Sequence, residues 1–403
     1  YVHVENDFND MDREPLMPHL LSTQGPALAV ADVNGDGLDD IFAGGAKWQQ
    51  GRLLLQQANG SYVIADSATF APDSISEDVD AAFFDANGDT HPDLYVVSAG
   101  NEFWGSMPEL RDRLYINDGR GHFTKSLDGL PAFYENGSCV VPGDFNGDGA
   151  IDLFVGSRVV AKQYGLSPKS HLLQNDGRGH FTDVTEQIAP ALLEAGMVTS
   201  AAWVDMDKDG TLDLVVAGEW MPVRMFRQSR GRFTDRTNDA GLSNSEGWWN
   251  HVAAADLNGD GRTDLVLGNL GLNSYLTASA TQPAEMYVFD FFGNGTLKQV
   301  ISFYKHGVSY PLATRDEMVK VMPALRAKFG SYKAFGASRV TDILPPEELK
   351  QARLLKAHTF ATSVALAGSD GRFTLAPLPL EAQFSRTYAS IVRDLDGDGT
   401  VDL

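Results

Sequence analysis

The sequence predicts an all-β fold built from repeated four-stranded units, and three observations support this prediction. A nine-residue acidic loop occurs six times, and a short apolar run follows each loop. The first aspartates of the first five loops, at positions 32, 85, 144, 205 and 256, lie 51 to 61 residues apart. A period of this length is typical of β-propeller blades and exceeds that of helical solenoids.

Each acidic loop carries oxygen-bearing side chains at its first, third, fifth and ninth positions, which converge on one point in a tight turn. Such a site suits a hard cation with six to eight oxygen ligands, and Ca²⁺ fits better than Mg²⁺, which keeps its waters. We therefore expect about six Ca²⁺ sites. With the seventh-position residues included, the predicted metal residues are Asp32, Asn34, Asp36, Leu38, Asp40, Asp85, Asn87, Asp89, His91, Asp93, Asp144, Asn146, Asp148, Ala150, Asp152, Asp205, Asp207, Asp209, Thr211, Asp213, Asp256, Asn258, Asp260, Arg262, Asp264, Asp394, Asp396, Asp398, Thr400 and Asp402.

The residues around the loops argue against an EF-hand, which needs flanking helices and a glutamate at position 12. Counted from Asp32, position 12 is Ala43. The runs after the loops, such as 94–97 and 265–268, are short and apolar, as in buried strands. Similar runs precede the loops at 27–31 and 252–255. Each loop is therefore expected to join strands one and two of a unit.

A second hairpin is predicted in the back half of most units. Residues 114–123 and 172–181 contain an Asn-Asp-Gly turn between apolar runs, and 225–233 and 53–62 contain weaker glycine turns. Such turns between alternating apolar residues are strong hairpin signals. Two hairpins per unit give four strands, which is one blade.

These features together resemble a known repeat. The segment Gly143-Asp-Phe-Asn-Gly-Asp-Gly-x-x-Asp-Leu-Phe-Val-Gly156 is similar to the FG-GAP or VCBS repeat of integrin α-subunit propellers and many bacterial surface proteins. The order of motifs, with Glu219-Trp220-Met-Pro and Gly247-Trp-Trp-Asn250 between units, most resembles the bacterial FG-GAP proteins related to cartilage acidic protein. The resemblance implies a calcium-stabilised propeller with its metal loops on one face, but it implies no function.

One loop departs from the pattern. The loop at Asp290 has Phe292 at its third position and Lys298 at its ninth, so we predict that it holds no metal. Counting it gives a seven-bladed propeller over 1–403 whose last blade is incomplete at residue 403. Residues 1–10 resemble outer strands of other units and are predicted to close the ring on the last blade; the alternative is that the chain is a fragment of a longer one.

The segment 307–358 is predicted to be a small helical insertion in the sixth blade. Its stretches 316–329 and 346–356 have helical apolar spacing, and 314–358 contains nine Lys or Arg against five Asp or Glu. Two interpretations remain open: a helical cap packed on the blade, or a docking element for an acidic partner.

Composition favours an extracellular protein. The chain has 32 basic and 54 acidic residues, a net charge of −22, which argues against nucleic-acid binding. Its one cysteine, Cys139, is expected to be a buried core residue. No apolar stretch reaches eighteen residues, so no membrane-spanning segment is predicted. We expect a secreted, cell-surface or periplasmic location and, from the resemblance, a bacterial origin.

Function is expected on the face opposite the metal loops, where the other connections of each unit emerge. Tryptophans occur there with Asn, Glu and Arg, which suits sugar stacking and equally a protein-binding surface; structural wedging between blades is the alternative. The predicted ligand-binding residues are Trp48, Glu102, Trp104, Arg158, Glu219, Trp220, Trp249, Asn250 and His251.

Three functional classes follow. The first is a calcium-stabilised surface module that binds a glycan or an extracellular protein. The second is an assembly subunit that docks a partner through the insertion. The third is a polysaccharide lyase that uses His251, Tyr388 or Arg158. The sequence has no Ser-His-Asp order, zinc signature or phosphate loop, so we predict that the protein is not an enzyme.

Overall fold

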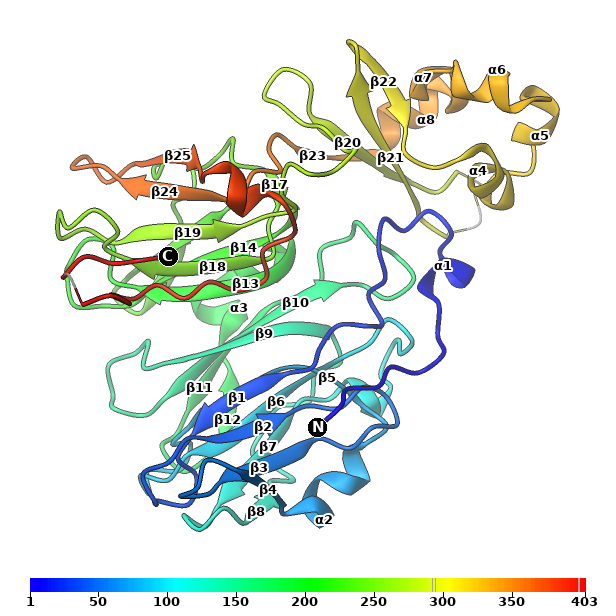
Figure 1. Ribbon diagram of the computed structural model, residues 1–403. Coiled ribbons are helices and arrows are strands. Elements are labelled where there is room, and N and C mark those ends of the chain that lie inside the picture. The colour runs from blue at the N-terminus through cyan, green and yellow to red at the C-terminus, as the bar shows by residue number, and fades with distance from the viewer. Residues whose placement is uncertain (292, 294, 398) are drawn as a thin grey trace.

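The structure, a computed structural model, describes residues 1–291, 293, 295–397 and 399–403. It is all-β, and its described strands form six antiparallel sheets with at least four strands each. Five of them, called sheets one to five, follow one another along the chain and lie side by side (Figure 1). The sixth, called the inserted sheet, interrupts sheet five. The predicted unit of two hairpins is thus confirmed.

Sheets one to five have the following strands. Sheet one contains β1 (Leu28–Ala31), β2 (Asp40–Ala43), β3 (Arg52–Gln56) and β4 (Tyr62–Ala65). Sheet two contains β5 (Glu77–Phe84), β6 (Asp93–Ala99), β7 (Arg113–Asn117) and β8 (Phe123–Lys125). Sheet three contains β9 (Asn136–Gly143), β10 (Asp152–Val159), β11 (His171–Asn175) and β12 (Phe181–Asp183). Sheet four contains β13 (Met197–Val204), β14 (Asp213–Met221), β15 (Arg224–Ser229) and β16 (Arg232–Asp235), with β17 (Gly247–Trp248) also pairing with β14. Sheet five contains β18 (His251–Ala255), β19 (Asp264–Gly268), β24 (Ser363–Ala367) and β25 (Phe373–Pro377).

The first strands of successive sheets line up along the inside of the array: β1 contacts β5, β5 contacts β9, β9 contacts β13, and β13 contacts β18. The second strands are the most buried, because both of their faces are covered. All seven residues of β6 are buried, as its unbroken apolar run Leu94–Val97 leads one to expect. Apolar side chains from neighbouring sheets form shared cores, for example Phe42 and Leu53 of sheet one with Tyr115 of sheet two.

The inserted sheet overturns the predicted order of blades. It consists of β20 (Ala284–Phe289), β21 (Lys298–Lys305), β22 (Val308–Pro311) and β23 (Arg353–Ala357), in the spatial order β22-β21-β20-β23. The chain leaves sheet five after β19 and returns to it at β24, where Leu265 pairs with Ala365. The Asp290 loop therefore belongs to the inserted sheet within the fifth unit, and 363–367 completes that unit. Neither forms a sixth blade.

Helices are short and concentrated between β22 and β23. The helices of the described chain are α1 (Asp10–Arg13), α2 (Ser67–Phe70), α3 (Thr185–Ile188), α4 (Arg315–Val321), α5 (Leu325–Lys328), α6 (Tyr332–Gly336), α7 (Val340–Ile343) and α8 (Pro346–Gln351). Single 3₁₀ turns occupy Ala71–Asp73, Pro108–Leu110, Pro190–Glu194 and Leu380–Gln383. Helix α4 starts at a capping box in which Thr314 and Glu317 bond each other's backbone N–H. The helix expected over 346–356 ends at Gln351, because the chain from Arg353 to Ala357 forms β23 and pairs with β20.

The two ends of the chain also differ from expectation. Residues 1–9 form no strand, and they lie against the connection after β2: the Tyr1 hydroxyl donates to the Gly44 carbonyl (2.5 Å), and the Val4 N–H donates to Gln49 Oε1 (3.0 Å). Among the residues that the structure describes, they make no ladder with the last unit. That unit, around Asp394, shows one isolated bridge between Arg393 and Asp402. No helix in the described part of the chain is long and apolar enough to cross a membrane.

Candidate functional site

The acidic loops share one internal geometry. In the first loop, Asp32 Oδ1 accepts the N–H groups of Gly35 (2.8 Å) and Asp36 (3.1 Å), and Asp32 Oδ2 accepts that of Gly37 (2.7 Å). Asp85, Asp144 and Asp256 make the same three kinds of contact. The first aspartate thus organises the turn and brings the third and fifth side chains towards it.

The ninth aspartate joins three parts of each unit. Asp40 Oδ2 accepts the Val33 N–H (3.1 Å) from the loop, and Asp40 Oδ1 accepts the Gln56 N–H (2.8 Å) from the third strand. The equivalent aspartates of sheets two, four and five, Asp93, Asp213 and Asp264, repeat this pair of contacts. In sheet three, Asp152 Oδ1 accepts the Asn175 N–H (2.8 Å) from the third strand. All five are at most 1 % exposed. Each carboxylate therefore fastens the loop to strand three.

Each loop gathers several carboxylates, and in the second and third loops the ninth aspartate is buried beside the others. Burial raises the pKa of Asp93 to about 6 and that of Asp152 to about 7, although both carboxylates accept backbone N–H groups. The charges of Asp148 and Asp144 raise the pKa of Asp152 further. A cation among these oxygens would relieve both the burial cost and the repulsion, so the residues fit Ca²⁺.

Two loops bring three carboxylates within reach of one ion. The ligand oxygens of Asp205, Asp207 and Asp209 lie within 4.8 Å of one another, and so do those of Asp394, Asp396 and Asp402. In the other four loops an asparagine stands at position three and offers an amide oxygen: Asn34, Asn87, Asn146 and Asn258. Asp398, a predicted ligand, lies outside the described residues.

The seventh-position residues have no common side-chain chemistry: they are Leu38, His91, Ala150, Thr211, Arg262 and Thr400. Their side chains cannot form a shared ligand set, so only their backbone is common to the loops. Arg262 instead pairs with the carboxylate of Asp260, and Arg227 pairs with Asp207.

At the Asp290 loop, Asp290 Oδ2 accepts the Gly295 N–H (2.6 Å), so the first aspartate keeps its organising contact. Phe292, on which the prediction of an empty site rests, lies outside the described residues. Lys298, at position nine, is the first residue of β21, and its ammonium cannot accept backbone N–H groups as the Asp40 carboxylate does.

A cavity of about 800 Å³ opens among the first strands of the sheets, at their ends away from the acidic loops. Three of the nine predicted ligand residues, Arg158, Asn250 and His251, line it together. Burial lowers the pKa of His251, whose Nε2 lies 2.9 Å from the Ser390 hydroxyl, so the imidazole is neutral at neutral pH. The remaining polar lining includes Gln24, Asp80, Arg386 and Tyr388.

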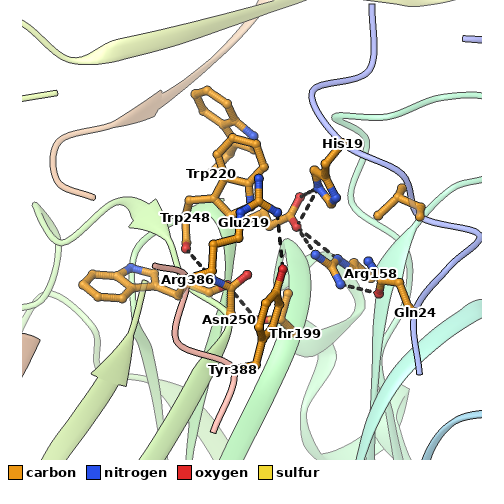
Figure 2. Close-up of polar contacts among 12 residues, drawn as sticks. His19, Gln24, Arg158, Thr199, Glu219, Trp220, Trp248, Asn250, Arg386 and Tyr388 are labelled. Atoms are coloured by element: carbon orange, nitrogen blue, oxygen red, sulfur yellow. Dashed lines mark hydrogen bonds and ion pairs between the residues drawn. The ribbon is translucent and has the colours of Figure 1, made fainter. Parts of the chain in front are cut away.

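Glu219, predicted to bind a ligand, is instead the centre of a buried ionic network (Figure 2). It accepts hydrogen bonds from Arg158 Nε (3.1 Å) and from the Tyr164 hydroxyl (2.5 Å), and it forms an ion pair with His19 Nε2 (3.1 Å). The second arm of the same guanidinium donates to Gln24. These contacts hold the pKa of Glu219 well below its usual range despite burial. The network ties the N-terminal segment to sheets three and four.

The tryptophans divide into structural and accessible ones. Trp220 and Trp249 are 3 % and 0 % exposed and donate to the Tyr164 hydroxyl (3.1 Å) and the Ser245 carbonyl (2.9 Å). The prediction that they stack on a ligand is wrong for this structure, because they fill the spaces between sheets. Trp48 and Trp104 are 69 % and 47 % exposed, but neither lines the cavity.

Lysines cover the two accessible rings, since Lys47 Nζ lies 4.7 Å from the Trp48 ring and Lys162 Nζ lies 3.3 Å from the Trp104 ring. The carboxylate of Glu102 forms an ion pair with Lys47 (2.8 Å) beside Trp48. These predicted residues therefore form a group separate from the cavity.

Sequence reasoning missed several residues at the cavity. Arg386 lies over the Trp248 ring at 4.9 Å, and His19 joins Glu219 across 200 positions. Gln24 likewise has no motif around it. No local spacing could have revealed these residues, because their neighbours are distant in the chain.

Residues 32–96, 85–155, 159–216 and 205–267 match the FG-GAP-like repeat family, and together these segments cover more than half of the chain. The chain belongs to the FG-GAP repeat β-propeller family. Sheets one to five are its blades, and the matched segments contain the first five acidic loops. A search of curated proteins finds no match.

Solved structures overlap the chain only loosely. The V. cholerae biofilm matrix protein Bap1 is 15 % identical with a TM-score of 0.31, over 73 % of this chain and 59 % of Bap1. A putative exo-beta-1,3-galactanase from Bifidobacterium bifidum s17 is 11 % identical with a TM-score of 0.34, over 74 % and 95 % of the two chains. A thermostable family-43 glycoside hydrolase is 9 % identical with a TM-score of 0.31, over 73 % and 96 %. We infer nothing about function from overlaps of this size.

Proposed function

We propose that this propeller is a calcium-stabilised extracellular or cell-surface module that binds a glycan in the cavity among its first strands. The observation that carries the proposal is the convergence of Asn250, His251 and Tyr388 in one cavity of about 800 Å³, at the ends of the strands away from the acidic loops. Cavities of ~300–1,000 Å³ are typical of ligand sites.

The chemistry of the lining suits a sugar. Tyr388 is 59 % exposed and offers an aromatic face, and Arg386 offers a guanidinium near it, with Nη1 3.4 Å from the Tyr388 hydroxyl. An aromatic face packs on the C–H side of a pyranose, while the guanidinium and the Asn250 amide bind hydroxyls or a carboxylate. Arg158 is less available, because Glu219 and Gln24 already occupy its donors.

Calcium is part of the proposal as a structural ion. The first, third, fifth and ninth side chains of the six loops would hold it, together with a carbonyl from the seventh residue. Its chemistry there is charge neutralisation and the fixing of strand-joining turns.

A glycan array probed in Ca²⁺ and in chelator tests the binding proposal. We expect selective binding in Ca²⁺, and about tenfold weaker binding for Tyr388→Ala. An aromatic contact contributes ~0.5–1.5 kcal/mol beyond its buried area, and a tenfold change in affinity corresponds to ~1.4 kcal/mol. Tyr275→Ala is the matched control, because Tyr275 is also exposed (72 %) but does not line the cavity.

An equal loss of glycan affinity in the two tyrosine variants would contradict the proposal that the glycan binds in the cavity. Loss with Trp48→Ala or Trp104→Ala alone would move the site to the lysine-covered tryptophans. If no glycan on the array binds, and a purified extracellular protein binds the cavity instead, the ligand is a protein and not a glycan. A partner lost only on substitution of exposed residues in α4–α8 would favour the assembly role.

A second candidate is a polysaccharide lyase, because Arg158, His251 and Tyr388 line the same cavity. The neutral His251 imidazole is suited to accept a proton, and Tyr388 to donate one. Turnover of uronic-acid polymers, measured as new unsaturated ends and lost in His251→Gln, would support the lyase; absence of turnover would leave the binding module.

A further inference from the structure

A second group of potential ligand atoms lies outside the acidic loops, near the N-terminus. The side chains of His3, Glu5 and Glu77 bring their ligand atoms within 4.8 Å of one another. His3 Nε2 and Glu5 Oε1 are 2.7 Å apart. Glu77 is the first residue of β5, so the group joins the N-terminal segment to sheet two.

The N-terminal segment is held against the sheets by contacts on either side of His3. The Tyr1 hydroxyl donates to the Gly44 carbonyl, and the Gln49 side chain both donates to the Val2 carbonyl (2.6 Å) and accepts the Val4 N–H (3.0 Å). Further along, the Asn6 side chain donates to Glu102 (2.6 Å). His3 and Glu5 are therefore fixed in position before any ligand binds, which lowers the entropic cost of binding.

Glu77 is the observation that points to a ligand. Its side chain is 1 % exposed, and Oε2 accepts the Lys47 N–H (2.9 Å). Oε1 is buried and has no hydrogen-bond partner in the described chain, and the same is true of Glu5 Oε2. Native proteins rarely leave buried carboxylate oxygens without a partner.

The charges around Glu77 increase the cost of leaving its carboxylate oxygen without a partner. Glu5, Asp78 and Glu102 add negative charge around the buried Glu77 carboxylate. The Lys47 ammonium is already used, since its Nζ pairs with Glu102 (2.8 Å). A cation between Glu5 and Glu77 would contact the unpartnered oxygens of both and offset this charge.

We propose that His3, Glu5 and Glu77 form a site for a divalent transition-metal ion, with Zn²⁺ as the best-fitting ion. One imidazole nitrogen and two carboxylates are common zinc ligands, whereas Ca²⁺ takes six to eight oxygens. Three protein ligands leave the fourth tetrahedral position for water or an exogenous ligand. The site thus differs in its ligand chemistry from the acidic loops, and it is separate from the glycan-binding cavity proposed above.

Calorimetric titration with ZnCl₂ tests this site in the tag-free full chain, with excess Ca²⁺ present to fill the acidic loops. We expect one Zn²⁺ per chain in the wild type and at least tenfold weaker binding in His3→Gln and in Glu77→Gln. The matched controls, His122→Gln and Glu186→Gln, change exposed residues of the same types and should bind as the wild type does. Wild-type affinity in both site variants would overturn the proposal.

Two further measurements keep the test decisive if a variant folds poorly. Zinc should raise the melting temperature of the wild type and not that of Glu5→Gln, whose half-buried side chain makes it the mildest of the three changes. Co²⁺ in place of Zn²⁺ should give the intense visible absorption of a four-coordinate site containing nitrogen. A weak octahedral spectrum, unchanged in His3→Gln but lost in Asp207→Asn, would assign the ion to an acidic loop and overturn the proposal.

Discussion

A buried histidine with two carboxylate partners joins three segments of sheet three. His171, the first residue of β11, is 4 % exposed and contacts Asp183 in the next strand, with Nδ1 2.8 Å from Oδ2, and Glu135 just before β9, with Nε2 3.4 Å from Oε2. Burial alone would lower its pKa, but these two carboxylates raise it to about 9. The same contact lowers the pKa of Asp183 to about 2 although burial opposes it.

The free energy of unfolding should therefore fall in mild alkali. Because the folded-state pKa of His171 lies above the unfolded value, its contribution is fully present below ~6.5 and is lost as pH rises through about 9. At most ~3 kcal/mol is at stake. Urea midpoints measured at about pH 6 and about pH 10 should differ more for the wild type than for His171→Gln. Equal differences for the two proteins would contradict this role.

The ninth aspartates, which we propose as calcium ligands, also act at the scale of the hairpin. Asp264 accepts the Leu257 N–H (3.1 Å) from the loop and the Ala367 N–H (2.7 Å) from β24. It therefore links β19 to β24, two neighbouring strands that the inserted sheet separates in the sequence. The sequence predicted the loop between β18 and β19, whose metal ligands stay a prediction. It did not predict this contact, because Ala367 lies 103 positions away.

In chelator, Asp264→Ala should lower the free energy of unfolding by ~3 kcal/mol or more, since each hydrogen bond to a charged group is worth ~1.5–3 kcal/mol. Asp260→Ala in the same loop removes a predicted metal ligand but no strand clamp, and should remain near the wild type under those conditions. Amide exchange at Ala367 should accelerate only in the first variant. Wild-type stability of Asp264→Ala in chelator would contradict the clamp and would show that Asp264 acts through metal alone.

The sequence predicts those parts of the fold that depend on neighbouring residues, and it does not predict contacts between distant segments. The hairpins around Asp32 or Asp144 are encoded in contiguous turns and apolar runs, and they were predicted. The pairing of Leu265 with Ala365 was not, because each hairpin has the same local pattern whichever sheet it joins. Likewise, the residues next to Trp249 in the sequence would be the same whether its ring packs between sheets or faces a ligand.

For the whole molecule, the acidic loops concentrate negative charge along one edge of the array, within a chain of net charge −22. Sheets one to five depend on these loops to join their first two strands. Removal of Ca²⁺ should therefore lower the melting temperature of the propeller as a whole rather than loosen one site.

Scanning calorimetry in Ca²⁺, in Mg²⁺ and in excess chelator tests this expectation. We expect the highest melting temperature in Ca²⁺, because Mg²⁺ retains its waters and fits the loops poorly. Half-saturation is expected at roughly 10⁻⁴ to 10⁻³ M Ca²⁺, the range of extracellular modules. An unchanged melt in chelator would refute calcium stabilisation.

The inserted segment leaves and rejoins the fifth blade at one place. There the Gly271 N–H donates to the Phe360 carbonyl (2.8 Å), and the Asn269 side chain donates to the Thr359 and Ala361 carbonyls (3.3 Å each), so a segment of nearly ninety residues starts and ends at adjacent points. A short linker could therefore replace this segment without changing the path of the chain through the blade. Its removal would still destabilise the protein, because Met286 and Ile301 share a core with Trp220 and Trp248 of the blades. Excision would keep the chain path intact and uncover that core, so a shortened protein should retain its blades only if polar side chains are placed where the inserted segment once packed.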